Sequence, residues 1–222
     1  MIGEIQAVIV DLDGTMVDTL GDFDVALNET LTALGRPGVS RGDIERMVGK
    51  GSAHLIRSAL LHGGLRADEA AALQADAWTL YQAHYLAING AHSAVYPGVV
   101  EGLTALREHG LPLACLTNKP LAFAEPLLKA KGLLGFFVHV FGGDSFERTK
   151  PDPLPLLKTC EALGTAPVHT LMVGDSQNDG IAARAAGCPV VLVTYGYNHG
   201  APVAQAPHDR LIDSLAELVS LS

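Results

Sequence analysis

The first strong hydrophobic pattern in the chain is a short apolar run over residues 7–10, which is rich in β-branched side chains. Such a run predicts a strand that is buried on both faces of a sheet. It ends at two carboxylates, Asp11 and Asp13, and Gly14 follows them. Because ligands of an open α/β sheet bind beyond the carboxyl ends of its strands, we expect both aspartates to lie on the floor of a crevice.

The next part of the chain shows only helical periodicity. Apolar residues recur at helical spacing, and glycine or proline residues separate the periodic stretches. The predicted helices cover residues 18–34, 41–48, 52–61 and 67–88. Ser40 is placed to cap the second of them. No strand pattern occurs between Thr19 and Val95. We therefore predict a helical domain over residues 19–94, inserted into a core made of residues 1–18 and 95–222.

Beyond Val95, strand and helix patterns alternate. The predicted strands cover residues 111–116, 136–141, 169–173 and 190–194, the last of which is expected to be the final strand. The predicted helices cover residues 99–109, 121–131, 153–163, 178–186 and 214–221. This alternation is typical of an α/β fold with a doubly wound, Rossmann-like parallel sheet and right-handed crossovers.

Composition and charge narrow the classes of partner. The chain has 222 residues, of which 48% are hydrophobic, and a formal net charge of −9. A globular core is therefore expected, and nucleic acid or an anionic membrane surface is disfavoured as a partner. No apolar run is long enough for a transmembrane helix, and no leader pattern is found, so we expect a cytoplasmic protein. Either a monomer or a homodimer is expected. Cys115, Cys160 and Cys188 are far apart, which favours buried free thiols over a zinc site or disulfides.

Polar residues lie close to the ends of several predicted core strands. They are Thr117, Asn118, Lys150, Asp175 and Asp179. Because parallel strands bring their carboxyl ends to one edge of a sheet, we expect these side chains to meet Asp11 and Asp13. Two carboxylates about 4 Å apart repel by about 4 kcal/mol at an effective dielectric constant of 20, and a divalent cation relieves that repulsion. The oxygen donors of Asp11 and Asp175 suit Mg²⁺ better than zinc.

These residue types suit phosphoryl transfer. A carboxylate that approaches a phosphate dianion meets a repulsion of about 8 kcal/mol by the same arithmetic, so Lys150 and Mg²⁺ are needed to allow the approach. Asp11 is placed to be the nucleophile that forms an aspartyl-phosphate, and Asp13 to be the general acid and base. The expected donors to the phosphoryl oxygens are the Thr117 hydroxyl and the backbone N–H groups of Leu12, Asp13 and Asn118.

Four motifs together resemble those of the haloacid dehalogenase superfamily, in the same order. They are Asp11-Leu12-Asp13-Gly14-Thr15 with Asp18, Thr117-Asn118-Lys119, Lys150-Pro151-Asp152-Pro153, and Gly174-Asp175-Ser176-x-Asn178-Asp179. The resemblance spans almost the whole chain and implies a hydrolase in which Asp11 is the nucleophile, Asp13 the acid and base, and Asp175 a Mg²⁺ ligand. It further implies that Asp11 and the carbonyl of Asp13 ligate the metal. By the same resemblance, Asp179 and Ser176 contact the metal ligands rather than the metal itself. The resemblance also implies that Gly14 and Thr15 belong to the phosphate-binding loop.

The helical insertion is similar to the cap of that superfamily, which closes over the site and contacts the substrate. Its junctions near residues 18–20 and 94–98 are expected to act as hinges. Within the cap, Lys50 lies in a glycine-flanked break between helices, so it is a candidate to pair with a substrate carboxylate. A solvated lysine in a helix turn is an equally favoured interpretation. Lys119 is expected to be a surface residue at the start of a helix.

The stretches 96–99, 173–179, 186–190 and 194–198 resemble those of phosphoglycolate phosphatases within the superfamily. This implies hydrolysis of 2-phosphoglycolate, a small phosphorylated metabolite, to glycolate and phosphate. A related sugar-phosphate phosphatase of broader specificity shares much of the same scaffold and stays open. A phosphosugar mutase also stays open, because it forms the same aspartyl-phosphate but returns the phosphoryl group to another hydroxyl.

Two other classes are disfavoured. A non-enzymatic binding module has no use for the full set of Asp11, Asp13, Lys150 and Asp175, all of which are present. A dehalogenase has no role for the second aspartate or the metal-binding carboxylates in halide displacement.

Overall fold

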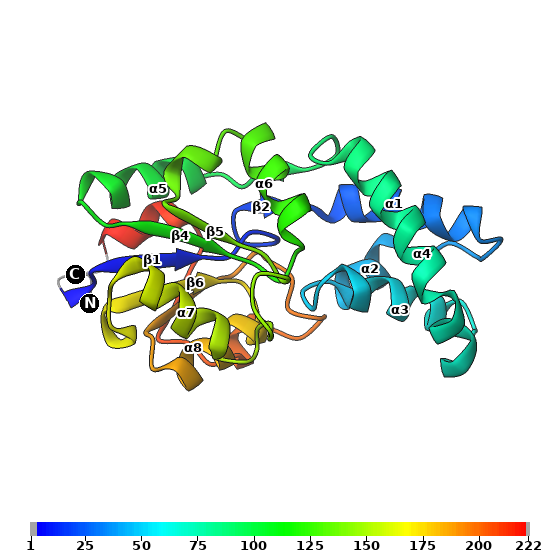
Figure 1. Ribbon diagram of the computed structural model, residues 1–222. Coiled ribbons are helices and arrows are strands. Elements are labelled where there is room, and N and C mark those ends of the chain that lie inside the picture. The colour runs from blue at the N-terminus through cyan, green and yellow to red at the C-terminus, as the bar shows by residue number, and fades with distance from the viewer. Residues whose placement is uncertain (1–3, 221–222) are drawn as a thin grey trace.

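The computed structural model describes residues 4–220 of the chain. Its core is a six-stranded sheet in the order β5-β4-β1-β6-β7-β8, and every neighbouring pair in it is parallel (Figure 1). The strands are β1 (Ala7–Val10), β4 (Leu113–Leu116), β5 (His139–Phe141), β6 (Thr170–Gly174), β7 (Val190–Val193) and β8 (Arg210–Ile212). The chain builds outward from β1 first on one side and then on the other, so the predicted doubly wound α/β fold is confirmed.

Alternation along β1 divides the core into two layers. Val8 and Val10 face a cluster that also contains Val99, while Ile9 between them packs on the opposite side with Leu156 and Ala182. The first layer belongs to α5 (Val99–Glu108), α6 (Leu121–Ala130) and the 3-10 helix η5 (Leu215–Ser220), and the second to α7 (Leu154–Leu163) and α8 (Gln177–Ala186). Because helices cover both faces, the β1 side chains are fully buried, as the uninterrupted apolar run predicted.

Three details of the core differ from the prediction. The strand predicted over residues 136–141 is shorter, because Phe136 belongs to the 3-10 turn η2 (Leu134–Phe136). The final strand is β8 rather than β7. The hydrophobic pattern did not predict β8, because this strand has only three residues, lies at the sheet edge and begins with exposed Arg210. The predicted closing helix is the 3-10 helix η5, and Leu221 lies outside the described residues.

The helical insertion forms a separate group of helices beside the carboxyl ends of the strands (Figure 1). It comprises α1 (Leu20–Ala33), α2 (Arg41–Met47), α3 (Ser52–His62) and α4 (Ala67–Ile88). These helices share an apolar cluster that includes Leu27, Ile44, Leu60 and Tyr81. The Ser40 side chain accepts a hydrogen bond from the Asp43 backbone N–H, at 3.2 Å, so it caps α2 as predicted.

Two very short strands connect the insertion to the core. β2 (Val17–Asp18) and β3 (Ala94–Val95) pair antiparallel, so the outgoing and returning segments lie side by side. The hydroxyl of Tyr197 accepts hydrogen bonds from the backbone N–H groups of Thr19 and Leu20, at 3.0 and 3.2 Å, and donates one to Asp18. The sequence did not predict this ribbon, because a two-residue strand is too short to show alternation.

Buried Asp22 ties α1 to the segment that follows α4. Its carboxylate accepts hydrogen bonds from the N–H groups of Gly90 (2.9 Å) and His92 (2.7 Å) and from the Ser93 hydroxyl (2.8 Å). We expect Asp22→Ala to lower the free energy of unfolding by about 3 kcal/mol, because three donors lose a charged acceptor. Urea denaturation measures this loss. Asp76→Ala, at an exposed position on α4, is the matched control and should change stability by less than about 0.5 kcal/mol. Equal stability of the two variants would contradict the assigned role.

The cysteines and the length of the helices also bear on the predictions. Cys115, Cys160 and Cys188 are buried free thiols, as predicted. None of the helices in the described part of the chain combines the length and the apolar character needed to cross a bilayer.

Candidate active site

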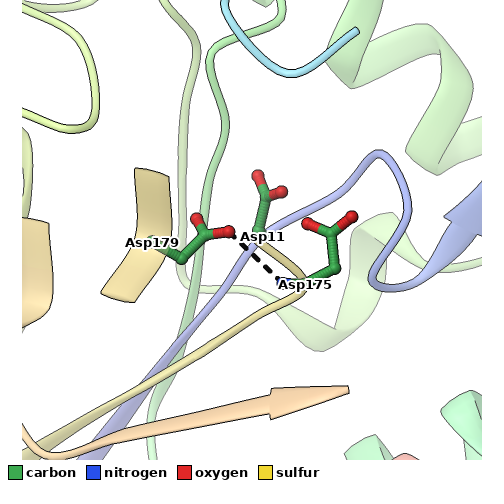
Figure 2. Close-up of side chains that lie close together, drawn as sticks. All are labelled: Asp11, Asp175 and Asp179. Carbon is green, nitrogen blue, oxygen red and sulfur yellow. Dashed lines mark hydrogen bonds between the residues drawn. The ribbon is translucent and has the colours of Figure 1, made fainter. Parts of the chain in front are cut away.

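Three buried carboxylates meet at the carboxyl end of the sheet (Figure 2). Asp11 follows β1, Asp175 follows β6, and Asp179 lies in the first turn of α8. One oxygen from each lies within 4.8 Å of the others. Asp179 is held by the backbone N–H of Asp175, at 3.3 Å, and by the hydroxyl of Ser176, at 2.8 Å. The structure therefore brings together side chains that the order of the strands predicted to converge.

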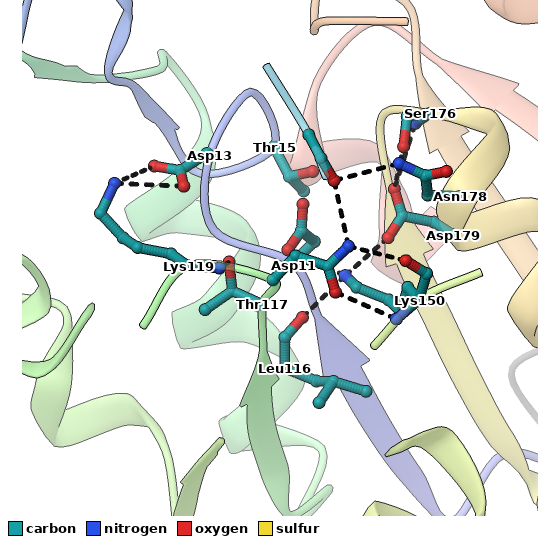
Figure 3. Close-up of polar contacts among 12 residues, drawn as sticks. Asp11, Asp13, Thr15, Leu116, Thr117, Lys119, Lys150, Ser176, Asn178 and Asp179 are labelled. Atoms are coloured by element: carbon teal, nitrogen blue, oxygen red, sulfur yellow. Dashed lines mark hydrogen bonds and ion pairs between the residues drawn. The ribbon is translucent and has the colours of Figure 1, made fainter. Parts of the chain in front are cut away.

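Lys150 neutralises part of this negative charge (Figure 3). Its Nζ lies 2.9 Å from Asp11 Oδ1 and 2.7 Å from Asp179 Oδ1, and it donates to the Leu116 carbonyl at 2.8 Å. The side chain is 2% exposed. Since an ammonium group has three N–H donors, these three acceptors use all of them.

The electrostatics of the cluster favour a second cation. Burial raises the pKa of Asp11 to about 7, although the Lys150 charge lowers it. Burial also raises the pKa of Asp175 well above its usual range, and the charges of Asp179 and Asp11 add to the effect. Burial opposes the charged form of Lys150, but its carboxylate partners outweigh this and raise its pKa. The donors are all carboxylate oxygens, which fit a hard divalent cation such as Mg²⁺.

The raised pKa of Asp11 predicts a pH-dependent stability of the metal-free protein. The folded-state pKa of about 7 exceeds the ordinary value of 3.8, so the folded protein binds more protons than the unfolded chain in that window. This contribution to stability is complete below the unfolded pKa and is lost as the pH rises through about 7. Asp11→Asn, which mimics the protonated carboxyl, should therefore be more stable than the wild type at alkaline pH and equally stable at acidic pH.

Thermal unfolding of both proteins in a chelator, from pH 5 to pH 8, measures this difference. A constant difference in melting temperature across the range would contradict the prediction. Saturating Mg²⁺ should stabilise the wild type more than the variant, because the ion binds an ionised carboxylate.

The orientation of Asp175 depends on neighbours in the loop after β1 and in the segment after β7. Its Oδ2 accepts a hydrogen bond from the Tyr197 backbone N–H at 2.6 Å, and its Oδ1 accepts one from the Thr15 hydroxyl at 3.4 Å. Gly14 lies against the same carboxylate with a φ of +83°, and a Cβ there would be 2.1 Å from Asp175 Oδ2. Both the backbone conformation and the space require glycine.

We expect Gly14→Ala to weaken Mg²⁺ binding by about 10- to 100-fold, because the added methyl group displaces a carboxylate of the cluster. Isothermal titration with Mg²⁺ measures the change. Gly110→Ala is the control, since Gly110 has a φ of +76° and a Cβ at that position would meet nothing within 4 Å, so it carries the same backbone strain away from the site. Equal Mg²⁺ affinities for the two variants would show that Gly14 does not shape the cluster.

Asp13 is turned away from this cluster and pairs with Lys119 (Figure 3). Lys119 Nζ lies 2.8 and 3.2 Å from the two Asp13 oxygens. Its ammonium also lies over the rings of Phe23, at 4.4 Å, and Tyr85, at 4.7 Å. Lys119 is 3% exposed, so the prediction of a surface lysine was wrong. Helices α1 and α4 cover it, and the local pattern near residue 119 does not report that contact.

A cavity lies between the core and the insertion. The core lines it with residues that include Asp11, Asp13, Thr117, Lys119 and Asp175, and the insertion lines it with Phe23, Val48, Gly49, Gly51, Ser52 and Leu55. The Gly49 carbonyl accepts hydrogen bonds from the side-chain amides of Asn118 and Asn178, each at 3.0 Å. The loop after β4 and the first turn of α8 therefore hold the insertion at one point. Sequence analysis missed this link, because a backbone carbonyl carries no side-chain signal.

A family model for haloacid dehalogenase-like hydrolases matches residues 5–187. The chain belongs to this family. It is 46% identical over 213 residues to a phosphoglycolate phosphatase of Thiobacillus denitrificans, covering 96% of this chain and 93% of that protein. It is 43% identical to a plasmid-encoded phosphoglycolate phosphatase of Cupriavidus necator, with 97% and 92% covered.

Solved structures agree with this assignment. A predicted phosphoglycolate phosphatase from Haemophilus somnus matches with a TM-score of 0.90 and 34% identity, covering 98% of both chains. The structure of CbbY from Rhodobacter sphaeroides in complex with phosphate matches with a TM-score of 0.81 and 28% identity, covering 96% of both chains. The resemblance seen in the four motifs is thus confirmed over nearly the whole chain.

The remaining predicted phosphate-binding groups of this family member lie around Asp11. The backbone N–H groups of Leu12, Asp13 and Asn118 donate to no other backbone group among the described residues. The N–H of Gly14, in contrast, donates to the Val17 carbonyl at 2.9 Å. The Thr117 hydroxyl accepts a hydrogen bond from the Lys119 N–H at 3.2 Å. Three donors are thus available to a ligand beside Asp11.

The Asn118 side chain and the position of Lys50 also bear on the predictions. The Asn118 side chain bonds both backbone groups of Lys150, accepting from the N–H at 3.0 Å and donating to the carbonyl at 2.8 Å, and so fixes the lysine. Lys50 is exposed and does not line the cavity. Its contact with a substrate stays a prediction.

Proposed function

We propose that this protein is a Mg²⁺-dependent phosphate monoester hydrolase that converts 2-phosphoglycolate to glycolate and phosphate. The observation that carries the proposal is the position of Asp11, which is ion-paired with Lys150 within a buried cluster of carboxylates. Asp11, Asp175 and the carbonyl of Asp13 would hold Mg²⁺, with Asp179 behind them. When bound, the ion neutralises the negative charge that otherwise keeps a phosphate dianion away from a carboxylate.

The reaction proceeds in two displacements. The Asp11 carboxylate attacks phosphorus, the ester P–O bond breaks, and Asp13 donates a proton to the leaving oxygen. Asp13 then takes a proton from a water molecule, which attacks the aspartyl-phosphate, releases phosphate and restores Asp11. The free N–H groups of Leu12, Asp13 and Asn118 are available to hold the phosphoryl oxygens, and Lys150 balances the charge next to the nucleophile.

We propose that the insertion, residues 19–94, is a cap that opens for the substrate and closes to exclude water, over a core of residues 1–18 and 95–222. The pairing of β2 with β3 places both connections together, which suits a hinge. The bonds from Asn118 and Asn178 to the Gly49 carbonyl hold the closed arrangement. Closing strengthens the electrostatic interactions of Asp11 by removing water.

The substrate is supported by similarity. Relatives at 46% and 44% identity over nearly the full chain are named phosphoglycolate phosphatase. A second support is the lining of the cavity, in which two lysines face a small space suited to a compact, highly anionic metabolite.

Phosphate release with Mg²⁺ from a panel of small monoesters tests the proposal. We expect the kcat/KM for 2-phosphoglycolate to exceed those for sugar phosphates and nucleotides by at least tenfold. Broad, weak release would replace this substrate with a general class of monoesters. An absence of release from every compound would overturn the assignment as a hydrolase and favour a mutase or a binding role.

A further inference from the structure

We propose that Lys119 binds the carboxylate of the substrate and thereby selects short phosphate monoesters that carry an acid group next to the ester carbon. This inference rests on the proposed function and adds a specificity-determining residue to it. It places the contact with the substrate carboxylate in the core, directly beside Asp13, rather than at exposed Lys50.

Burial makes the Lys119 ammonium dependent on an anionic partner. The side chain is 1% exposed and lines the cavity, and its hydrogen-bonded acceptors are the two oxygens of Asp13. A buried ammonium without such a partner is costly, so it attracts whatever anion enters the cavity. The faces of Phe23 and Tyr85 hold it from the other side, because aromatic faces attract cations.

The charges that line the cavity leave this role to Lys119. Lys119 and Lys150 are the cationic residues of the lining, and they face Asp11, Asp13, Asp175 and Asp179. Lys150 has no donor to spare, because its three acceptors are Asp11, Asp179 and the Leu116 carbonyl. A divalent ion balances the remaining charge of the lining. A substrate with both a phosphate and a carboxylate then brings further negative charge, for which Lys119 is the available cation.

The position of Lys119 fixes the length of the substrate. In the proposed reaction Asp13 turns its carboxyl group to the leaving oxygen, and Lys119 Nζ lies 2.8 Å from that carboxyl group in the structure. Lys119 therefore lies within one side-chain rotation of Asp13 from the leaving oxygen. In 2-phosphoglycolate the carboxylate is attached to the carbon that carries this oxygen, so it reaches the ammonium. We expect a carboxylate several carbons further away to bind less well, because Asp13 and the rings of Phe23 and Tyr85 surround the ammonium closely.

Binding of the substrate carboxylate to Lys119 also explains how Asp13 becomes free for catalysis. In the absence of substrate, Asp13 serves as the counter-ion of Lys119. A substrate carboxylate replaces it as that counter-ion, and Asp13 is then free to rotate toward the leaving oxygen. An ester without the carboxylate offers no such replacement. The same contact therefore favours 2-phosphoglycolate both in binding and in the positioning of the acid.

The test compares two substrates of equal length, 2-phosphoglycolate and ethyl phosphate, in the wild type and in Lys119→Met, Lys119→Gln and Lys119→Arg. The measured quantity is the ratio of their kcat/KM values. Any general loss that both substrates share cancels in this ratio. We expect Lys119→Met and Lys119→Gln to lower the ratio by about 10- to 100-fold, with a higher KM for 2-phosphoglycolate. Lys119→Arg keeps the positive charge and should retain most of the wild-type ratio.

The outcomes separate this inference from the function on which it rests. An unchanged ratio in both neutral variants, whether the individual rates fall or not, would overturn the inference and leave Lys119 as a residue that only positions Asp13. Failure of the proposed function shows instead in the wild type, as no preference for 2-phosphoglycolate over ethyl phosphate.

Binding to an inactive background gives a second readout. In Asp11→Asn protein, adding Lys119→Met should weaken the binding of 2-phosphoglycolate by calorimetry much more than that of ethyl phosphate. Equal weakening would also overturn the inference. Lys119→Gln serves in this measurement if the Met variant does not fold.

Discussion

Replacing Asp11 with Asn is expected to lower phosphate release by about 10⁴-fold or more. The amide nitrogen and oxygen of Asn are poor nucleophiles, so the first displacement at phosphorus has no acceptor for the phosphoryl group. The rest of the site should persist, because Asp11 is buried at the end of a fully buried strand and Asn occupies nearly the same volume. A coupled assay of phosphate release, with Mg²⁺ and saturating substrate, measures the loss.

The control is Asp76→Asn on α4, which removes a carboxylate at an exposed position and should leave the rate unchanged. A loss of less than tenfold for Asp11→Asn would mean that Asp11 is not the nucleophile. Mass spectrometry of the wild type during turnover adds independent evidence, since a phosphoryl group attached to the tryptic peptide that contains Asp11 is the expected intermediate.

Replacing Lys150 with Met is expected to lower the free energy of unfolding by about 3–5 kcal/mol. The side chain is 2% exposed and is ion-paired with both Asp11 and Asp179. Methionine fills a similar volume but leaves two buried carboxylates without their counter-ion and the Leu116 carbonyl without its donor. Unpaired charges in a low-dielectric interior are the most costly groups to bury.

Urea denaturation in a chelator at pH 8 measures this loss. Lys158→Met on α7 is the matched control, because its ion pair with Glu161 is exposed and should contribute little to stability. The loss in Lys150→Met should shrink at pH 5, where Asp11, with a pKa raised to about 7, is mostly protonated even in the wild type. A loss as small as that of Lys158→Met at pH 8 would show that the buried pairs contribute no net stability.

The insertion and the proposed catalytic groups are connected through a few polar contacts. Asn118 bonds both to Gly49 of the insertion and to the backbone of Lys150, and Lys119, the next residue, bonds to Asp13. The loop after β4 thus contacts the insertion, Lys150 and Asp13. Closure of the cap and alignment of these groups are therefore expected to occur together.

The order of the hydrophobic and polar patterns was enough to predict the fold class and the convergence of the buried carboxylates. The apolar run that became β1 reports burial on both faces, and the alternation beyond Val95 dictates a parallel sheet. Since parallel strands end on the same edge, the positions of Asp11 and Asp175 followed from the order of the elements. The range predicted for α4, residues 67–88, also matches the structure, because a long helix repeats its periodic signal over many turns.

The contacts between the insertion and the core could not be predicted from local patterns. Lys119 looks like an exposed residue at a helix start, and it is buried because Phe23 and Tyr85, distant in sequence, cover it. The same holds for the Gly49 carbonyl, the β2–β3 ribbon and the edge strand β8. Periodicity indicates which face of a helix or strand is buried. The features named here depend instead on contacts between elements that are far apart in the chain, and no local pattern specifies those contacts.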